Sequence, residues 1–171
     1  MLPFATLLLS VVMFGPAALE PITETSVLDA PTRHIRAMQG STRTLLRRGY
    51  RESPSFAALV KRLQRSDVYV YVEQVDRLPG ALEGRLIMLP RAHEHRYVRI
   101  QLAMHGAPED CIAVLGHELQ HAVEVAEAED VFDEAGMNRL YQRIGIRGGE
   151  HLYDTAAAQQ MGRTVRRELV S

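Results

Sequence analysis

Two histidines one helical turn apart mark the residues best suited to chemistry in this chain. They belong to the run His117-Glu118-Leu119-Gln120-His121. On a helix, side chains at positions i and i+4 share a face, so both imidazoles can bind one metal ion. The carboxylate of Glu118 can then contact a water molecule held by that ion and take its proton. The pattern therefore predicts a hydrolytic metal site with Glu118 as general base.

The surrounding residues favour a helix that packs on a core while the histidines face another side. Pro108 suits a first helical turn, Glu109 and Asp110 suit the positive end of a helix, and the period continues to about Glu127. An apolar stripe at i+3 and i+4 spacing comprises Ile112, Leu115, Leu119, Ala122 and Ala126. The alternative interpretation is a pair of histidines on a polar helix face, bonded to neighbouring carboxylates such as that of Glu124.

The five-residue pattern resembles the H-E-x-x-H signature of the zincin metallopeptidases, and the strict resemblance covers only these five residues in their helix. The looser order of strands, motif helix and later helix is also similar to the core of that superfamily. The resemblance implies that His117 and His121 bind zinc and that an edge strand before residue 105 holds the substrate. The metzincin branch extends the motif to H-E-x-x-H-x-x-G-x-x-H. This chain has Glu124 and Glu127 at the added glycine and histidine positions, which speaks against a metzincin.

In the gluzincin branch the third ligand is an acidic residue on a later helix, often within an E-x-x-x-D pattern, and Glu150 and Asp154 have that spacing. We expect a helix that starts after Gly148-Gly149 and runs toward Leu169. Its inward stripe would be Asp154, Ala158, Met161, Val165 and Leu169.

An inward carboxylate among apolar residues needs a partner, and a metal ion supplies one, so Asp154 is our preferred third ligand. Glu150 is the second choice, and in that case Asp154 would orient a histidine. The remaining alternatives are Glu124, Glu127 and His151.

The elements before the motif predict a small sheet with helices around it. Three segments rich in β-branched and aromatic residues are strand candidates, at 68–74, 85–90 and 97–104. An apolar period at Phe56, Leu59, Val60 and Leu63 indicates an N-terminal helix, and another helix is expected over 131–144. The predicted fold is α+β: a small zincin-like domain with an N-terminal helix, a three-stranded antiparallel sheet, the motif helix and C-terminal helices.

The first residues differ from the rest in composition. Residues 2–19 carry no charge, and small residues follow the apolar centre, as in an export signal. We expect a signal peptide or membrane anchor at 1–20, a linker at 21–32, where no apolar period is present, and the folded domain at 33–171. A misassigned start or a buried helix is the alternative for the first segment. The expected location is secreted or periplasmic, with membrane attachment through residues 2–19 if the segment is retained.

Composition limits the classes of partner. The chain of 171 residues is 46% hydrophobic and has a formal net charge of -1, so no net field favours nucleic acid or an anionic membrane surface. Eight arginines and one lysine between Arg33 and Arg65 oppose the single acid Glu52, while 109–134 contains nine acids and no Lys or Arg. We expect these two stretches to pair with each other. A docking site for an anionic partner is the alternative.

Other candidate residues have simpler interpretations. His93-Glu94-His95 indicates a turn, with an accessory metal site as the alternative. Cys111, the single cysteine, excludes an intramolecular disulfide and is expected to be buried. The residues Tyr141, His151 and Tyr153 are expected to be structural, with oxyanion stabilisation as the alternative.

These observations predict an exported zinc-dependent metallopeptidase with one Zn2+ per chain, held by His117, His121 and Asp154. Its partner would be a peptide or protein substrate, and we expect no nucleic acid. Two alternatives use the same residues. One is a catalytically inactive or metal-stabilised zincin-like module that binds a partner through its charged N-terminal half. The other is a metal-dependent hydrolase of non-peptide amides.

Overall fold

The computed structural model of the chain describes residues 33–149 and 152–171. The signal or anchor segment predicted at 1–20, the linker predicted at 21–32, and the candidates Glu150 and His151 lie outside these described residues. Within the described ranges, no helix has the length and apolar character needed to cross a membrane.

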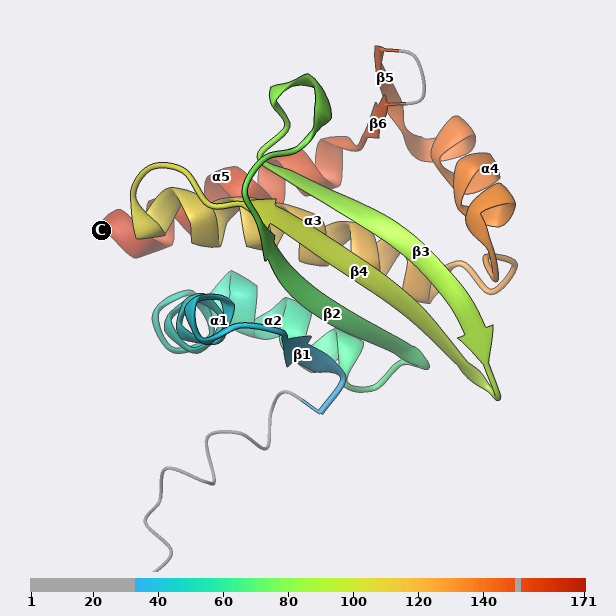
Figure 1. Cartoon of the computed structure of the whole chain (residues 1–171), viewed down its shortest axis with the longest axis horizontal. Coiled ribbons are helices and arrows are strands. Elements are labelled where there is room, and N and C mark those ends of the chain that lie inside the picture. The colour runs from blue at the N-terminus through green and yellow to red at the C-terminus, as the bar shows by residue number, and fades with distance from the viewer. Residues whose placement is uncertain (1–32, 150–151) are drawn as a thin grey trace, which may run out of the picture.

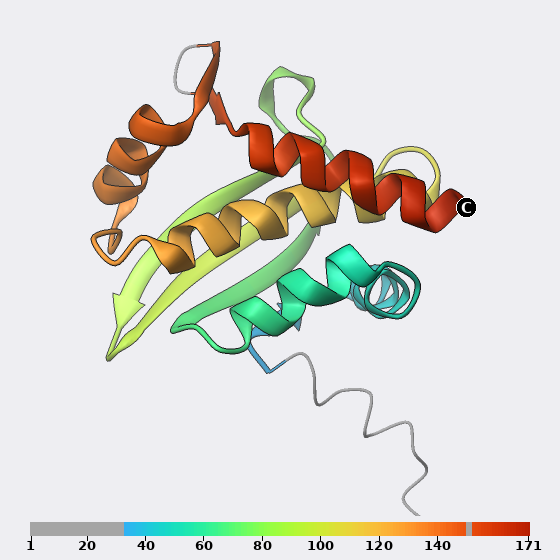
Figure 2. The same cartoon turned by 180° about the vertical axis from the view of Figure 1, so that it is seen from behind.

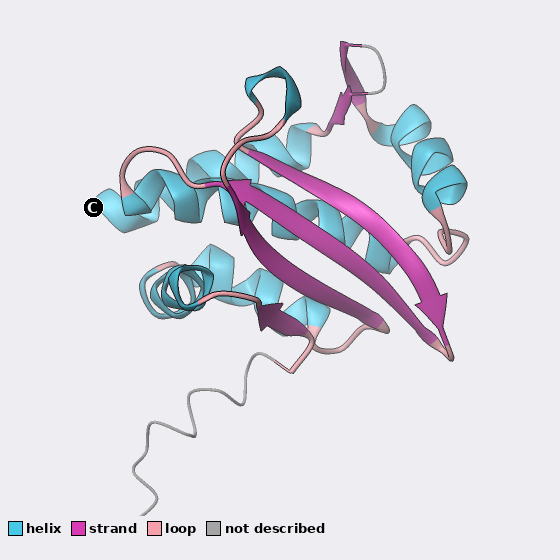
Figure 3. Cartoon of the chain, viewed as in Figure 1, coloured by secondary structure: helices cyan, strands magenta, loops and turns pink. Residues whose placement is uncertain are grey.

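A four-stranded mixed sheet forms one layer of the molecule (Figures 1 and 3). Its order is β1 (Ile35–Ala37), β2 (Val68–Val75), β4 (His95–Ala103) and β3 (Gly84–Ala92). The α+β class is as expected, and β3 pairs with β4 antiparallel. The expectation of three antiparallel strands is corrected in two respects: β1 adds a fourth strand, and β1–β2 and β2–β4 are parallel pairs.

The connection after β2 explains the parallel pairing. Residues 76–83 contain a short 3-10 turn at Pro79–Ala81 and carry the chain to the far edge of the sheet, where β3 begins. β4 then returns by a hairpin between β2 and β3. β2 and β3 are neighbours in sequence but do not pair, because the loop between them is longer than a tight turn.

The helices lie on one side of this sheet, as the view from behind shows (Figure 2). They include α1 (Gly40–Glu52), α2 (Pro54–Leu63), α3 (Pro108–Glu127) and α5 (Ala156–Val170). α3 contacts β2, β3 and β4 directly, and α5 packs on α3. α4 (Glu134–Ile144) stands beside the sheet and leads into a two-stranded ribbon of β5 (Ile146–Gly149) and β6 (Leu152–Asp154).

Capping residues set where the helices begin. The predicted N-terminal helix is α2, which starts after Ser53, whose hydroxyl accepts from Phe56 N, and α1 precedes it as a separate helix. α4 starts at Glu134, later than expected, because Asp133 caps it. The prediction of a helix directly after Gly148-Gly149 was wrong. Those glycines belong to β5, and α5 starts only after Thr155, whose hydroxyl accepts from Ala158 N.

The core fills the space between the sheet and the helices. The predicted motif helix is confirmed as α3, and four residues of its stripe are fully buried: Ile112, Leu115, Leu119 and Ala122. They pack with inward residues of the strands such as Val70 and Ile100, in the same buried cluster. Burial of this stripe fixes the rotation of α3 about its axis, and with it the direction in which the histidines point.

Arg96 in β4 holds the C-terminal end of α3 against the sheet. Its side chain is 4% exposed, and its guanidinium makes a bidentate pair with Asp67 at 2.6 and 2.7 Å. The remaining donors reach the carbonyl groups at the end of the helix and just beyond it, those of Val125, Ala126, Ala128 and Val131. A buried cation thus satisfies carbonyl groups that the helix leaves unpaired and complements its negative end.

The charged stretches of the sequence pair with each other along α3, as expected. Arg48 of α1 bonds to Glu109 at 2.5 Å near the start of α3, and Arg62 of α2 bonds to Glu127 at its end. These ion pairs join the basic N-terminal helices to the acidic helix that carries the motif.

Candidate metal centre

Three potential ligand atoms converge at one point between α3 and the end of β6. His117 Nε2 lies 3.2 Å from His121 Nε2 and 3.2 Å from Asp154 Oδ1, and the third side, from His121 Nε2 to Asp154 Oδ1, is 3.5 Å. These residues form the one group of at least three His, Cys, Asp or Glu side chains within the described ranges that is arranged to hold a metal ion. The structure therefore brings together the three residues that the sequence favours as metal ligands.

The size of this triangle fits zinc. Zinc with imidazole and carboxylate ligands at 2.0–2.2 Å in tetrahedral geometry places ligand atoms about 3.3–3.5 Å apart. The observed sides of 3.2, 3.2 and 3.5 Å are close to that spacing without rearrangement of the side chains. Two imidazole nitrogens in such contact repel unless a proton or a cation lies between them, so the donor set is suited to a cation.

Asp154 reaches the histidines by a route different from the predicted one. It is the last residue of β6 and precedes the N-cap of α5, so it is not part of the helical stripe expected for it. Thr155 N donates to Asp154 Oδ1 at 2.7 Å, and Gln159 Nε2 donates to Oδ2 at 3.0 Å. The carboxylate is thereby fixed from its own backbone and from the first turn of α5.

Glu124 lies behind His121 and supports it, as the sequence allowed. His121 Nδ1 lies 2.9 Å from Glu124 Oε2, and the hydroxyl of Thr155 donates to Glu124 Oε1 at 2.6 Å. This bond orients the imidazole so that Nε2 faces His117 and Asp154. Glu127, by contrast, is 61% exposed and pairs with Arg62, which removes it from the group of alternative ligands.

Two glycines allow α5 to approach α3 closely. A Cβ added at Gly116 would lie 2.9 Å from Val165 Cγ2, and one added at Gly162 would lie 3.4 Å from His117 Cβ. With larger residues at these positions the helices would be forced apart. The short side chain of Asp154 can therefore reach histidines on the neighbouring helix.

The carboxylate of Glu118 is buried beside the triad, and its position depends on Gly84. A Cβ added at Gly84, the first residue of β3, would lie 2.7 Å from Glu118 Oε1 and 2.8 Å from Val114 Cγ1. The missing side chain therefore leaves the space that the carboxylate occupies. The role of Gly84 is not predictable from the sequence, because nothing in its local pattern indicates which element it faces.

Burial and charge shift the pKa values of these groups in the absence of a metal. Burial raises the pKa of Glu118 to about 7. Burial and repulsion from His121 lower the pKa of His117, although the nearby carboxylates oppose this. For His121, burial is outweighed by hydrogen bonds to Asp154 and Glu124, which raise its pKa to about 9. For Asp154, burial acts to raise the pKa, but the hydrogen bonds from His121, Gln159 and Thr155 and the nearby His117 together outweigh it and lower the pKa to about 2. The carboxylates of Asp154 and Glu124 thus favour a positive charge on His121.

A cleft of about 700 Å³ opens above the triad. Its lining includes His117, Glu118 and Asp154, the start of β3 at Gly84, and Arg163 from α5. The triad is thus accessible from solvent on one side and supported by Glu124 on the other. A metal held there would be open to a ligand from the cleft.

No family model, curated protein or solved structure matches the chain. The assignment of the site therefore depends on its own geometry.

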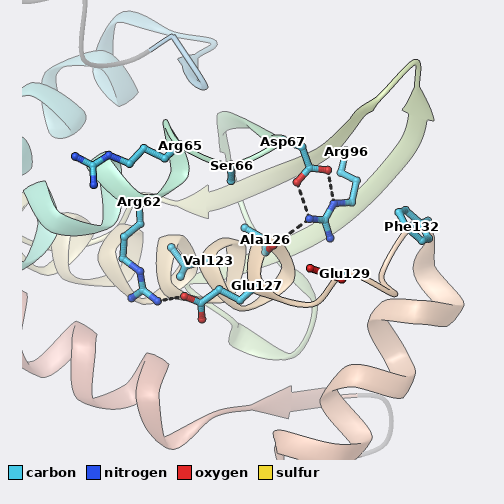
Figure 4. A pocket seen from close by; sticks show the side chains of 10 residues that line it. All are labelled: Arg62, Arg65, Ser66, Asp67, Arg96, Val123, Ala126, Glu127, Glu129 and Phe132. Carbon is cyan, nitrogen blue, oxygen red and sulfur yellow. Dashed lines mark hydrogen bonds and ion pairs between the residues drawn. The ribbon is translucent and has the colours of Figure 1, made fainter.

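A second cavity, of about 570 Å³, lies on the other side of the motif helix, near its C-terminal end (Figure 4). Its charged side chains are largely paired with one another: Arg96 bonds to Asp67, and Arg62 to Glu127. All the guanidinium donors of Arg96 are also used within the protein. This cavity therefore has few charged groups left to bind a ligand.

The remaining candidates have structural positions. His93, with φ 54°, lies in the turn between β3 and β4, Glu94 there is 92% exposed, and His95 packs edge-on against Tyr69. Cys111 is buried, which raises its pKa. Tyr141 donates to His121 O at 3.3 Å and is 7% exposed, so it supports the histidine from behind.

Proposed function

We propose that this chain is a zinc-dependent metallopeptidase. The observation that carries the proposal is the triangle of His117 Nε2, His121 Nε2 and Asp154 Oδ1, whose sides of 3.2, 3.5 and 3.2 Å suit tetrahedral zinc. Three protein ligands leave a fourth position for water or substrate, which distinguishes catalytic from structural zinc. The cleft above the triad supports that use of the fourth position.

The triad, Glu118 and Glu124 each have a role in this proposal. Zinc bound to the triad would polarise a peptide carbonyl and lower the pKa of water. Glu118 lines the cleft next to His117, and its carboxylate takes the proton from the attacking water and delivers it to the leaving amine. Glu124 keeps His121 in the orientation for binding.

The position of β3 supports a peptide as the substrate. β3 is the edge strand of the sheet next to the motif helix, and its first residue, Gly84, lines the same cleft as Glu118. An extended peptide can pair with the free edge of such a strand through main-chain hydrogen bonds. This placement agrees with the edge strand that the zincin resemblance implies.

The proposal is tested by replacing Glu118 in zinc-loaded protein. With a library of quenched fluorescent peptides, Glu118→Gln is expected to lower kcat/KM by at least about 100-fold, because the general base is lost. The matched control is Glu83→Gln, which removes an exposed carboxylate from the lining of the same cleft and should retain activity.

Preserved activity in Glu118→Gln would overturn this mechanism. Zinc binding without turnover of any peptide would favour the non-catalytic module. Turnover of small amides but not of peptides would favour the amide hydrolase.

A further inference from the structure

The sheet has one face that no described element covers. All the helices that contact β1, β2 and β4 lie behind these strands, and inward residues alternate with less buried outward ones along β2 and β4 (Figures 1 and 2). Parallel strands usually have both faces covered. Here the three parallel strands leave one face open, and its side chains are unusual for a solvated surface.

Tyrosines and arginines dominate this face. The three tyrosines Tyr69, Tyr71 and Tyr97 point outward from β2 and β4, and the three arginines Arg36, Arg85 and Arg99 accompany them from β1, β3 and β4. We refer to these six residues as the tyrosine–arginine face. The strand register places Tyr69 opposite Tyr97, and Tyr71 opposite both Arg36 and Arg99.

The rings of this face pack against one another. Tyr69 and Tyr97 are stacked with centroids 5.5 Å apart, Tyr71 and Tyr97 are 6.4 Å apart, and His34 stacks on the other side of Tyr69 at 4.2 Å. The guanidinium of Arg36 lies over Tyr69 and Tyr71 at 5.5 and 5.8 Å from the ring centroids. The ring faces are therefore already occupied, and none of the three hydroxyls bonds to a described residue.

The face carries excess positive charge. At the outward positions of the four strands of this sheet, Glu73 is the one acid among the described residues, and its carboxylate lies 3.8 Å from Arg99 Nε. Arg85 bonds to the neutral Gln101, and Arg36 contacts tyrosine rings without a carboxylate partner among the described residues. Two aliphatic residues, Ile87 and Leu89, continue the same rows on β3.

We propose that the tyrosine–arginine face binds an acidic polypeptide segment in extended conformation. Its phenol hydroxyls, and the guanidinium nitrogens other than the Arg85 Nε that bonds to Gln101, are donors that match carboxylate acceptors. The aliphatic side chains of Ile87 and Leu89 match the side chains between the carboxylates. This inference is separate from the metal site, because the face lies on the side of the sheet away from α3.

Two other occupants fit this face less well. A second copy of the chain would place arginines against arginines across a symmetric interface. Single-stranded nucleic acid binds by stacking its bases on aromatic ring faces, and here those faces are turned against one another.

The test is fluorescence anisotropy of the full chain with a labelled decapeptide of alternating glutamate and serine at low salt. The wild type should bind this peptide and not the matched peptide of alternating lysine and serine. Arg36→Gln with Arg99→Gln should weaken binding by about tenfold. Arg43→Gln with Arg77→Gln removes the same charge from exposed sites elsewhere and should change binding by less than about twofold.

A second pair of substitutions separates a specific face from general attraction. Tyr71→Phe with Tyr97→Phe keeps the rings and removes two hydroxyl donors, so binding should weaken by a few-fold while the fold is retained. Absence of glutamate-peptide binding, or equal loss in both arginine pairs, would overturn the proposal. Tighter binding of a ten-nucleotide thymidine strand than of the peptide would also overturn it, in favour of a nucleic-acid partner.

Discussion

Gly84 is the residue on which the position of the Glu118 carboxylate most directly depends. Replacement by alanine would place a Cβ 2.7 Å from Glu118 Oε1, so the carboxylate must move. In an assay of the proposed peptide hydrolysis, Gly84→Ala is expected to lower kcat/KM by about 100-fold, because a misplaced general base is inefficient, while zinc content stays the same. The control is Gly40→Ala, where an added Cβ has no atom within 4 Å. Unchanged activity in Gly84→Ala would contradict the role given to this contact.

Replacement of Glu124 tests whether its hydrogen bond to His121 strengthens zinc binding at the proposed site. Glu124→Gln removes the charge that faces His121 Nδ1 at 2.9 Å and weakens the bond from Thr155. Zinc affinity should fall by about 10- to 100-fold in a chelator competition titration. Glu127→Gln, on the same helix and 61% exposed, serves as control and should leave the affinity unchanged. Equal affinities of wild type and Glu124→Gln would show that this hydrogen bond does not tune the site.

At the residue scale, the sequence was sufficient to predict which side chains lie close together when they belong to one local pattern. His117, Glu118 and His121 lie in a single helix, so their spacing alone places them together. Asp154 was the preferred acid for a reason that the structure does not support, since it precedes α5 and is held by backbone and Gln159 contacts. Gly84 and Thr155 were missed, because their roles arise from contacts with residues far away in sequence.

At the scale of the elements, α3 depends on Arg96. Arg96→Met would leave several carbonyl groups at the end of α3 unpaired and Asp67 without its partner. We expect the free energy of unfolding, measured by urea denaturation, to fall by about 3–5 kcal/mol. Arg99→Met, on the same strand with its side chain 43% exposed, should cost less than about 1 kcal/mol. Similar values for both variants would contradict the assigned role.

The Asp67–Arg96 pair also predicts a pH dependence. The hydrogen bond from Arg96 lowers the pKa of Asp67 below its usual value, against the opposing effect of burial. Since the folded-state pKa is depressed, the contribution to stability is complete above the unfolded pKa of about 3.9 and is lost as pH falls through the folded value. The stability difference between wild type and Asp67→Asn should therefore shrink below about pH 4. A difference that grows on acidification would contradict this assignment.

Element boundaries were predictable where the signals are local. α3 agrees with its predicted range of 108–127, since Pro108, two first-turn acids and a continuous apolar stripe all indicate the same helix. α5 starts later than predicted, because Thr155 caps it and β6 pairs with β5 instead. The separate helix α1 and the three-residue strand β1 lack a pattern long enough to be recognised.

At the scale of the whole molecule, the strand and helix patterns predicted the α+β class. The distribution of charge along the chain predicted the pairing of basic and acidic stretches, which Arg48–Glu109 and Arg62–Glu127 confirm. The sheet order was not predictable from patterns within strands. It depends on the path of residues 76–83, which places β4 between β2 and β3. That order makes β3 the edge strand beside the cleft. The helices that contact the sheet lie on its other side, so no described element covers the tyrosine–arginine face.

The central claim is that one zinc ion is held by His117, His121 and Asp154. Elemental mass spectrometry of the purified chain is predicted to give about one zinc per chain for the wild type and for Glu118→Gln. It should give almost none for His117→Ala or Asp154→Ala. Asp130→Ala, which removes a carboxylate that is 59% exposed, is the matched control and should keep the zinc. Absence of zinc from the reconstituted wild type, or its retention in Asp154→Ala, would contradict the assignment.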